Sequence, residues 1–191
     1  MTRLLLRRNE RTQSHHGVAP RRLVGLTLLL IGTALPVLAK EPGPKDFPCL
    51  LTGIRPEGRK FVVYHKNKRK MRKAAAIAAR DLPGKAYPVG TVIQVLPIEA
   101  MMKREKGYNP AGHDWEWFQL TFDADGNTTI KSHGGAEVKN FASCQGCHLT
   151  GDAPAHDLVC EGHNSIPSFF TLDQAVVAQA NDPRCKKRKA R

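Results

Sequence analysis

Residues 115–132 read WEWFQLTFDADGNTTIKS, and this stretch decides which fold the sequence predicts. Residues 115–122 and 128–132 are rich in aromatic and β-branched residues, which favour β-strands. Between them, DADGN at 123–127 combines Asp, Asn and Gly, residues that favour tight turns. Two strand sequences joined by so short a loop predict a β-hairpin, and therefore an antiparallel sheet.

Shorter patterns on both sides of the hairpin extend this prediction. Residues 61–64 and 91–96 are apolar and β-branched, and predict two further strands. Residues 71–79 are rich in Ala, and residues 173–180 follow Thr171 and Gln174, which form a capping-box sequence; both predict helices. The sequence therefore predicts an α+β fold, an antiparallel β-sheet domain with short flanking helices.

The first 39 residues have the composition of a secretory signal peptide. They contain six Arg and one Glu, and the 13 residues 23–35 form an uncharged apolar run that ends at Pro36-Val37-Leu38-Ala39. A basic start, a short apolar core and a V-x-A end are typical of a cleaved leader. We expect export to the periplasm and no stable membrane span after cleavage. A retained anchor is the alternative, although a span needs about 20 apolar residues.

The net charge of +13 by itself suggests a nucleic-acid-binding protein, but the positions of the charged residues argue against that interpretation. Of the 24 basic residues after the leader, 12 lie in two runs, at 66–73 and 184–191. The remainder has 12 basic and 16 acidic residues, so it is mildly acidic and no nucleic-acid partner is expected. We expect a solvated helix face or loop at 66–73, a folded domain over 40–183 and a disordered basic tail over 184–191.

Residues 144–148 read CQGCH, the C-x-x-C-H sequence to which haem c is attached. Cys144 and Cys147 can bond to the two vinyl groups of one haem, because positions i and i+3 of a helix face the same side. His148 then supplies the proximal iron ligand. The prediction is one covalently bound haem c on a late helix of the domain. A zinc site completed by Cys160 and His163, or a dithiol redox site, is the alternative.

The position of the motif narrows the kind of cytochrome. Only 43 residues follow His148 and none of them is Met, so a downstream Met cannot be the sixth iron ligand, as in small electron-transfer cytochromes c. A four-helix-bundle cytochrome c′ has helices upstream of its motif, where this chain has predicted strands. Neither architecture matches the predicted fold.

The chain resembles the cytochrome P-460 and cytochrome c′-beta superfamily, in which a C-x-x-C-H motif follows a β-rich domain. The resemblance covers roughly residues 60–165 and rests on YPVGTVI at 87–93, KREKGYNP at 103–110, DWEWF at 114–118, SCQGCH at 143–148 and DLVC at 157–160. It implies an antiparallel β fold with short helices, often homodimeric, that holds one haem c with an open or water-occupied distal side.

Members of this superfamily with the P-460 chromophore carry a Lys bonded to the porphyrin, on the strand after the G-T-V sequence, and oxidise hydroxylamine. The same register puts Val95 at that position, and residues 91–96 contain no Lys. The resemblance therefore implies the cytochrome c′-beta condition, a five-coordinate haem under an apolar cap that binds NO or CO. Val95, Trp117 and Phe118 are candidates for this cap, with core packing as the alternative for the aromatic residues.

We expect an exported mono-haem c-type cytochrome that binds a small diatomic gas or exchanges electrons with a redox partner protein, with a homodimer as a candidate assembly. The expected cofactor-binding residues, of which His148 is the metal ligand, are Cys144, Cys147, His148, Val95 and Phe118. The alternative is an oxidoreductase that acts on hydroxylamine or NO at the haem iron, with Glu99 or Glu105 as its acid–base residue.

Three cysteines lie outside the motif, and an oxidising compartment allows two of them to pair. We expect a bond between Cys49 and Cys160, because Cys185 lies in the charged tail. Asp157 is expected to cap a turn, with orientation of the haem propionates as the alternative. Four histidines are candidate sixth ligands but lie in polar stretches and are expected at the surface: His113, His133, His156 and His163.

Overall fold

The hairpin predicted from residues 115–132 is present in the computed structural model, which describes residues 40–139, 142–159 and 170–186. Its strands are β4 (Trp115–Phe122) and β5 (Thr128–Gly134), which pair in antiparallel register. In the turn, the Asp123 carboxylate accepts the backbone N–H groups of Asp125 and Asn127, at 3.0 and 2.7 Å. The predicted signal peptide, Cys160 and His163 lie outside the described residues.

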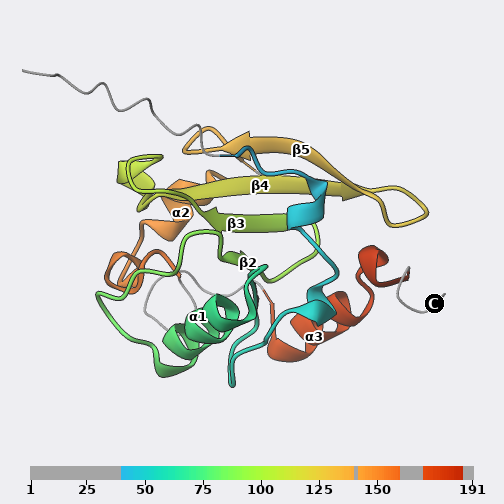
Figure 1. The fold of residues 1–191 in the computed structure, drawn as a ribbon, viewed down its shortest axis with the longest axis horizontal. Coiled ribbons are helices and arrows are strands. Elements are labelled where there is room, and N and C mark those ends of the chain that lie inside the picture. The colour runs from blue at the N-terminus through green and yellow to red at the C-terminus, as the bar shows by residue number, and fades with distance from the viewer. Residues whose placement is uncertain (1–39, 140–141, 160–169, 187–191) are drawn as a thin grey trace, which may run out of the picture. The chain divides into compact units, whose positions relative to one another are not determined.

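The hairpin forms one side of a five-stranded antiparallel sheet, in which each strand pairs with the next one in the sequence (Figure 1). The preceding strands are β1 (Val62–Tyr64), β2 (Val92–Gln94) and β3 (Glu99–Lys103). Together with the short helices, this sheet confirms the predicted α+β class.

β3 is not predicted by its local sequence, because EAMMK consists of residues that favour helices over strands. In the structure, β3 lies between β2 and β4, and Met101 is opposite both Ile93 and Trp117. The backbone hydrogen bonds from two neighbouring strands therefore override the local preference of these residues.

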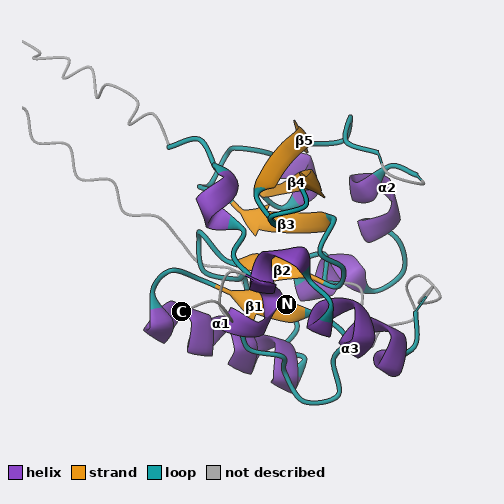
Figure 2. Cartoon of the chain, turned by 90° about the vertical axis from the view of Figure 1, so that its right-hand side faces the viewer, coloured by secondary structure: helices purple, strands orange, loops and turns teal. Residues whose placement is uncertain are grey.

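The α-helices of the described residues are α1 (Lys68–Arg80), α2 (Cys144–His148) and α3 (Leu172–Ala180). Asn67 caps α1 by accepting two backbone N–H groups of the first turn, so the helix begins three residues before the predicted range 71–79. Thr171 and Gln174 form the predicted capping box of α3. Both α1 and α3 lie next to the β1 side of the sheet (Figures 1 and 2). Turns of 3-10 helix lie at Pro44–Asp46, Leu50–Thr52, Pro110–Gly112, Ala153–His156 and Pro183–Cys185.

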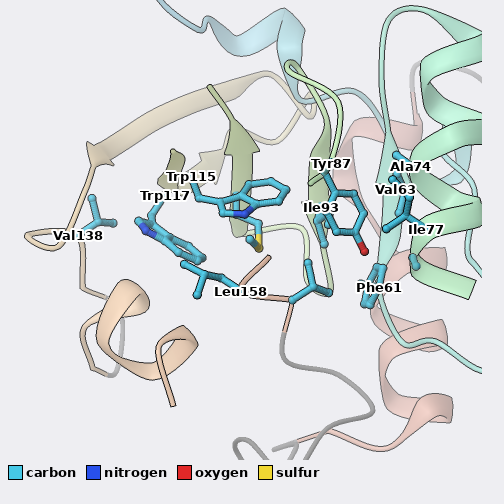
Figure 3. Packing of buried hydrophobic residues seen from close by; sticks show 13 residues of the cluster. Phe61, Val63, Ala74, Ile77, Tyr87, Ile93, Trp115, Trp117, Val138 and Leu158 are labelled. Carbon is cyan, nitrogen blue, oxygen red and sulfur yellow. The ribbon is translucent and has the colours of Figure 1, made fainter. Parts of the chain in front are cut away.

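Apolar side chains pack on both faces of the sheet, because successive residues of a strand point to opposite sides. The larger cluster, which we call the α1-side core, includes Trp115 and Trp117 of β4 (Figure 3). Phe118, the next residue of β4, belongs to the cluster on the other face, together with Phe47. The full α1-side core comprises Phe61, Val63, Ala74, Ile77, Ala78, Tyr87, Ile93, Met101, Trp115, Trp117, Val138, Leu158 and Val159.

The C-terminal end of the domain corrects two predictions. Cys49 is bonded to Cys185, so the predicted Cys49–Cys160 pair is wrong. Arg184 is buried, and its guanidinium donates hydrogen bonds to the Asp182 carboxylate and the carbonyl oxygen of Phe47. The predicted start of a disordered tail at residue 184 is therefore also wrong, because a buried carboxylate neutralises the Arg184 charge that we counted as solvated.

Candidate functional site

α2 is a single short helix that carries the whole C-x-x-C-H sequence. Ser143 caps it by accepting the backbone N–H of Gly146 at 3.1 Å. Cys144 and Cys147 occupy the first and fourth helical positions, which lie on the same side of a helix. Both residues are thiols in the structure, whereas Cys49 and Cys185 form a disulfide. The local fold therefore places the two cysteines on one side of the helix, with His148 directly after the second.

The imidazole of His148 is held from two directions. Its Nδ1 donates a hydrogen bond to the backbone carbonyl oxygen of Leu158 at 2.7 Å, and its ring packs against Trp117 with the ring centroids 4.5 Å apart. Burial lowers the pKa of this imidazole, and the hydrogen bond to Leu158 opposes that effect only in part. A neutral ring with its proton on Nδ1 has its lone pair on Nε2, the state in which histidine binds a metal.

The start of α2 is anchored to β4 and to the segment before it. Asn109 donates from Nδ2 to Gln145 Oε1 at 2.8 Å and to the backbone oxygen of Trp115 at 2.9 Å. The backbone N–H of Cys144 donates to the carbonyl oxygen of Val138 at 3.1 Å. These bonds fix the first cysteine of the motif against the sheet.

The carbonyl that accepts from His148 is itself positioned by a buried ion pair. Asp157 directly precedes Leu158. Lys103 Nζ donates hydrogen bonds to both oxygens of the Asp157 carboxylate, at 2.6 and 2.8 Å. The two side chains are only 7–8% exposed. Tyr87 donates its backbone N–H to the same carboxylate at 2.9 Å, and Trp115 Nε1 donates to the Asp157 carbonyl at 2.7 Å. The loop that supports His148 is therefore tied to β3 and β4.

Asp157 also fulfils its predicted role in a turn. It follows the Ala153–His156 turn of 3-10 helix in a left-handed conformation, with φ of 56°, and its N–H bonds to the Ala153 carbonyl. The ion pair with Lys103 was not predicted. The sequence offers no signal for it, since 54 residues separate the partners.

The sheet separates Phe118 from the other two candidate cap residues, Val95 and Trp117. Val95 is partly buried and packs against the α1-side core, as Cys144 does. Phe118 lies on the opposite face, where its ring is 5.7 Å from that of His133 and 4.7 Å from that of Phe47. The structure therefore does not bring Phe118 to α2. The alternation of strand side chains was the signal that could have shown this, because Trp117 and Phe118 are neighbours in β4.

The other candidate residues lie away from a common centre. His113 is half-exposed, 3.6 Å from Asp157, and His133 is bonded to Glu116 on the face of Phe118. His156 pairs with Asp81 at 2.9 Å. Of the two candidate acid–base residues, Glu99 is the first residue of β3, and Glu105 lies in the exposed loop after β3.

The residues around α2 fit a flat, mainly apolar group with a polar edge. Two thiols and an imidazole can attach and coordinate such a group, and Trp117, whose ring packs against His148, supplies apolar surface. Trp117 Nε1 is buried and has no hydrogen-bond partner within the described part of the chain. Haem is such a group, since its porphyrin is apolar and its two carboxylates are polar.

None of the helices in the described residues is long and apolar enough to cross a membrane. Comparison of the chain with protein-family models, with curated proteins and with solved structures finds no match in any of the three.

Proposed function

We propose that the chain is an exported c-type haem protein that holds one covalent haem and binds a small gas or transfers electrons. The observation that carries this proposal is the pairing of the Cys144 and Cys147 thiols with an adjacent His148 whose Nδ1–H is bonded to the Leu158 carbonyl. This hydrogen bond fixes the proton on Nδ1 and puts the ring lone pair on Nε2, the arrangement that is common for histidine ligands of a metal.

The attachment chemistry needs no oxidant and no leaving group. Each S–H would add across one vinyl double bond of haem, with sulfur bonding to one carbon and hydrogen to the other. Cys144 and Cys147 would supply the two thiols, and His148 would hold the iron. When bound, the haem would supply a redox-active iron.

Two observations support function outside the cytoplasm. The leader sequence at 1–39 is typical of a signal peptide. The Cys49–Cys185 disulfide independently favours an oxidising compartment.

Because no Met follows His148 in the sequence, we propose a weakly ligated distal side, suited to a neutral diatomic gas or to an electron partner protein.

The decisive experiment is a haem stain on a denaturing gel, after expression with a cytochrome c maturation system. We expect a stained band for the wild type and none for Cys144→Ala/Cys147→Ala. The matched control, Cys49→Ala/Cys185→Ala, also removes two cysteines and should keep the stain. An unstained wild type, or zinc bound in its place, would overturn the proposal.

Absorption spectra of the reduced protein test the open distal side. We expect a five-coordinate ferrous spectrum that changes on addition of NO or CO. His148→Ala should keep the stain but lose the wild-type spectrum, because its thioethers remain while its proximal ligand is gone. A six-coordinate low-spin spectrum without added ligand would contradict an open site.

A further inference from the structure

The first two turns of α1 carry a cluster of positive charges. Five of the first six residues of the helix are basic, and all five are exposed. We call them the basic face of α1: Lys68, Arg69, Lys70, Arg72 and Lys73. Later in the helix, Ala74, Ile77 and Ala78 belong to the α1-side core instead. Figures 1 and 2 show α1 outside the sheet, beside β1, where a partner can reach the exposed side chains.

The chain does not neutralise this charge. No acidic residue occurs between Glu57 and Asp81 in the sequence. Lys66, just before the helix, forms an ion pair with Asp46. No ion pair joins the basic face of α1 to an acidic side chain among the residues that the structure describes. The basic face therefore carries five positive charges that are free to attract an external partner.

The arrangement of these charges opposes the folding of the helix. Basic side chains at the start of a helix lie at the positive end of its dipole, which disfavours them. Like charges three or four positions apart also repel. The basic face contains four such pairs, Lys68 with Arg72, Arg69 with Arg72, Arg69 with Lys73, and Lys70 with Lys73. Charges that lower stability and lie within about 8 Å along the helix axis indicate an anionic partner outside the chain.

We infer that the basic face of α1 binds the anionic headgroups of a lipid bilayer. A stable interface with a folded protein has an apolar, often aromatic, centre. Among residues 68–73 only Met71 is apolar, and it is half-buried. Attraction to an anionic bilayer needs only charge, and a cluster of roughly four to eight Lys and Arg is typical of it.

The binding is peripheral and independent of the haem. The apolar residues of α1 are already buried in the α1-side core, so the helix has no apolar face to insert between the lipids. The attraction is therefore electrostatic, and salt weakens it.

The test measures binding of the protein, isolated after export, to vesicles of phosphatidylglycerol mixed with phosphatidylcholine. The test variant is Lys68→Gln/Arg69→Gln/Lys70→Gln/Arg72→Gln/Lys73→Gln. The matched control loses the same charge from exposed lysines elsewhere in the domain: Lys45→Gln/Lys85→Gln/Lys106→Gln/Lys131→Gln/Lys139→Gln. We expect the partition coefficient to fall by about a hundredfold or more in the test variant and by less than about tenfold in the control.

Thermal unfolding checks that the test variant is folded. Its melting temperature should be at least that of the wild type, because the substitutions remove repulsion within α1. If it does not fold, Arg69→Gln/Arg72→Gln replaces it, with Lys106→Gln/Lys131→Gln as the control, and the same order of losses is expected.

Several outcomes would overturn the inference. Equal losses in test variant and control, or equal binding of the wild type to pure phosphatidylcholine, would show that the basic face is not the binding surface. Loss only in the tail variant, Lys186→Gln/Lys187→Gln/Arg188→Gln/Lys189→Gln/Arg191→Gln, would assign the binding to the other basic run. Release by inorganic phosphate, but not by sodium chloride of equal ionic strength, would assign a site for free phosphate. A wild type that binds polyglutamate and not the vesicles would assign an acidic protein as the partner.

Discussion

His148 donates a hydrogen bond from Nδ1 to the backbone carbonyl oxygen of Leu158 at 2.7 Å. Leu158 has a left-handed backbone, with φ of 64°, and so does Asp157 before it, with φ of 56°. Left-handed conformations are unfavourable for residues other than Gly and need support from their surroundings. Lys103 gives that support through its buried pair with Asp157, so a lysine of β3 helps to position the proposed iron ligand.

Lys103→Met should destabilise the protein by about 3–5 kcal/mol, because it leaves the Asp157 carboxylate buried without its cation. The double variant Lys103→Met/Asp157→Leu should lose less free energy of unfolding than either single variant, because it leaves no buried charge unpaired. Urea unfolding of the three variants and the wild type measures these differences. Additive losses in the double variant would show that the two side chains do not act as a pair.

Removal of the Cys49–Cys185 disulfide should lower the free energy of unfolding by about 2–5 kcal/mol, because the bond links residues 136 positions apart. Thermal unfolding of Cys49→Ala/Cys185→Ala tests this, with Cys160→Ala as the control that should keep the wild-type stability. Mass spectrometry of a non-reduced digest should find the peptides of Cys49 and Cys185 linked. A link to Cys160 would contradict the structure.

Lys68→Glu should stabilise the protein by about 0.3–1 kcal/mol, because the first turn of α1 has basic residues and no acidic one at the positive end of the helix dipole. The matched variant Arg80→Glu replaces the basic residue of the last turn and should destabilise by a similar amount. Melting temperatures at low salt measure both changes. A shift of both variants in the same direction would exclude the dipole as the cause.

Partial burial, together with a hydrogen bond to Glu116, raises the pKa of Tyr108 to about 12, although the residue is 40% exposed. A raised pKa means that the folded protein favours the neutral phenol. Tyr108 therefore adds to the free energy of unfolding at pH values below its usual pKa of about 10, and this contribution is lost as the pH rises toward 12. The difference in unfolding free energy between wild type and Tyr108→Phe should therefore shrink between these two pH values. A difference that stays constant over that range would contradict the raised pKa.

Phe118→Leu should destabilise the protein by about 0.5–3 kcal/mol, because Phe118 is buried on the face of the sheet away from α2. The absorption spectrum of the proposed haem in this variant should nevertheless match that of the wild type. Trp117→Leu, at the neighbouring position on the other face, should change that spectrum. Equal spectral changes in both variants would refute the separation of the two side chains by the sheet.

Local sequence was sufficient to predict the hairpin of β4 and β5, helices α1 and α3 and the α+β class. Each of these elements is specified by residues that are near one another in the chain. The candidate attachment residues Cys144, Cys147 and His148 were also predictable, because their spacing over one helical turn already places two thiols beside an imidazole.

Tertiary structure alone decided which distant residues meet. β3 forms because β2 and β4 flank it, Cys49 pairs with Cys185, and Lys103 reaches Asp157 across 54 residues of sequence. The sheet also separates Phe118 from α2 and places Trp117 against His148. These contacts depend on how whole elements pack, and neither residue type nor local spacing encodes a contact between segments that meet only in the folded chain.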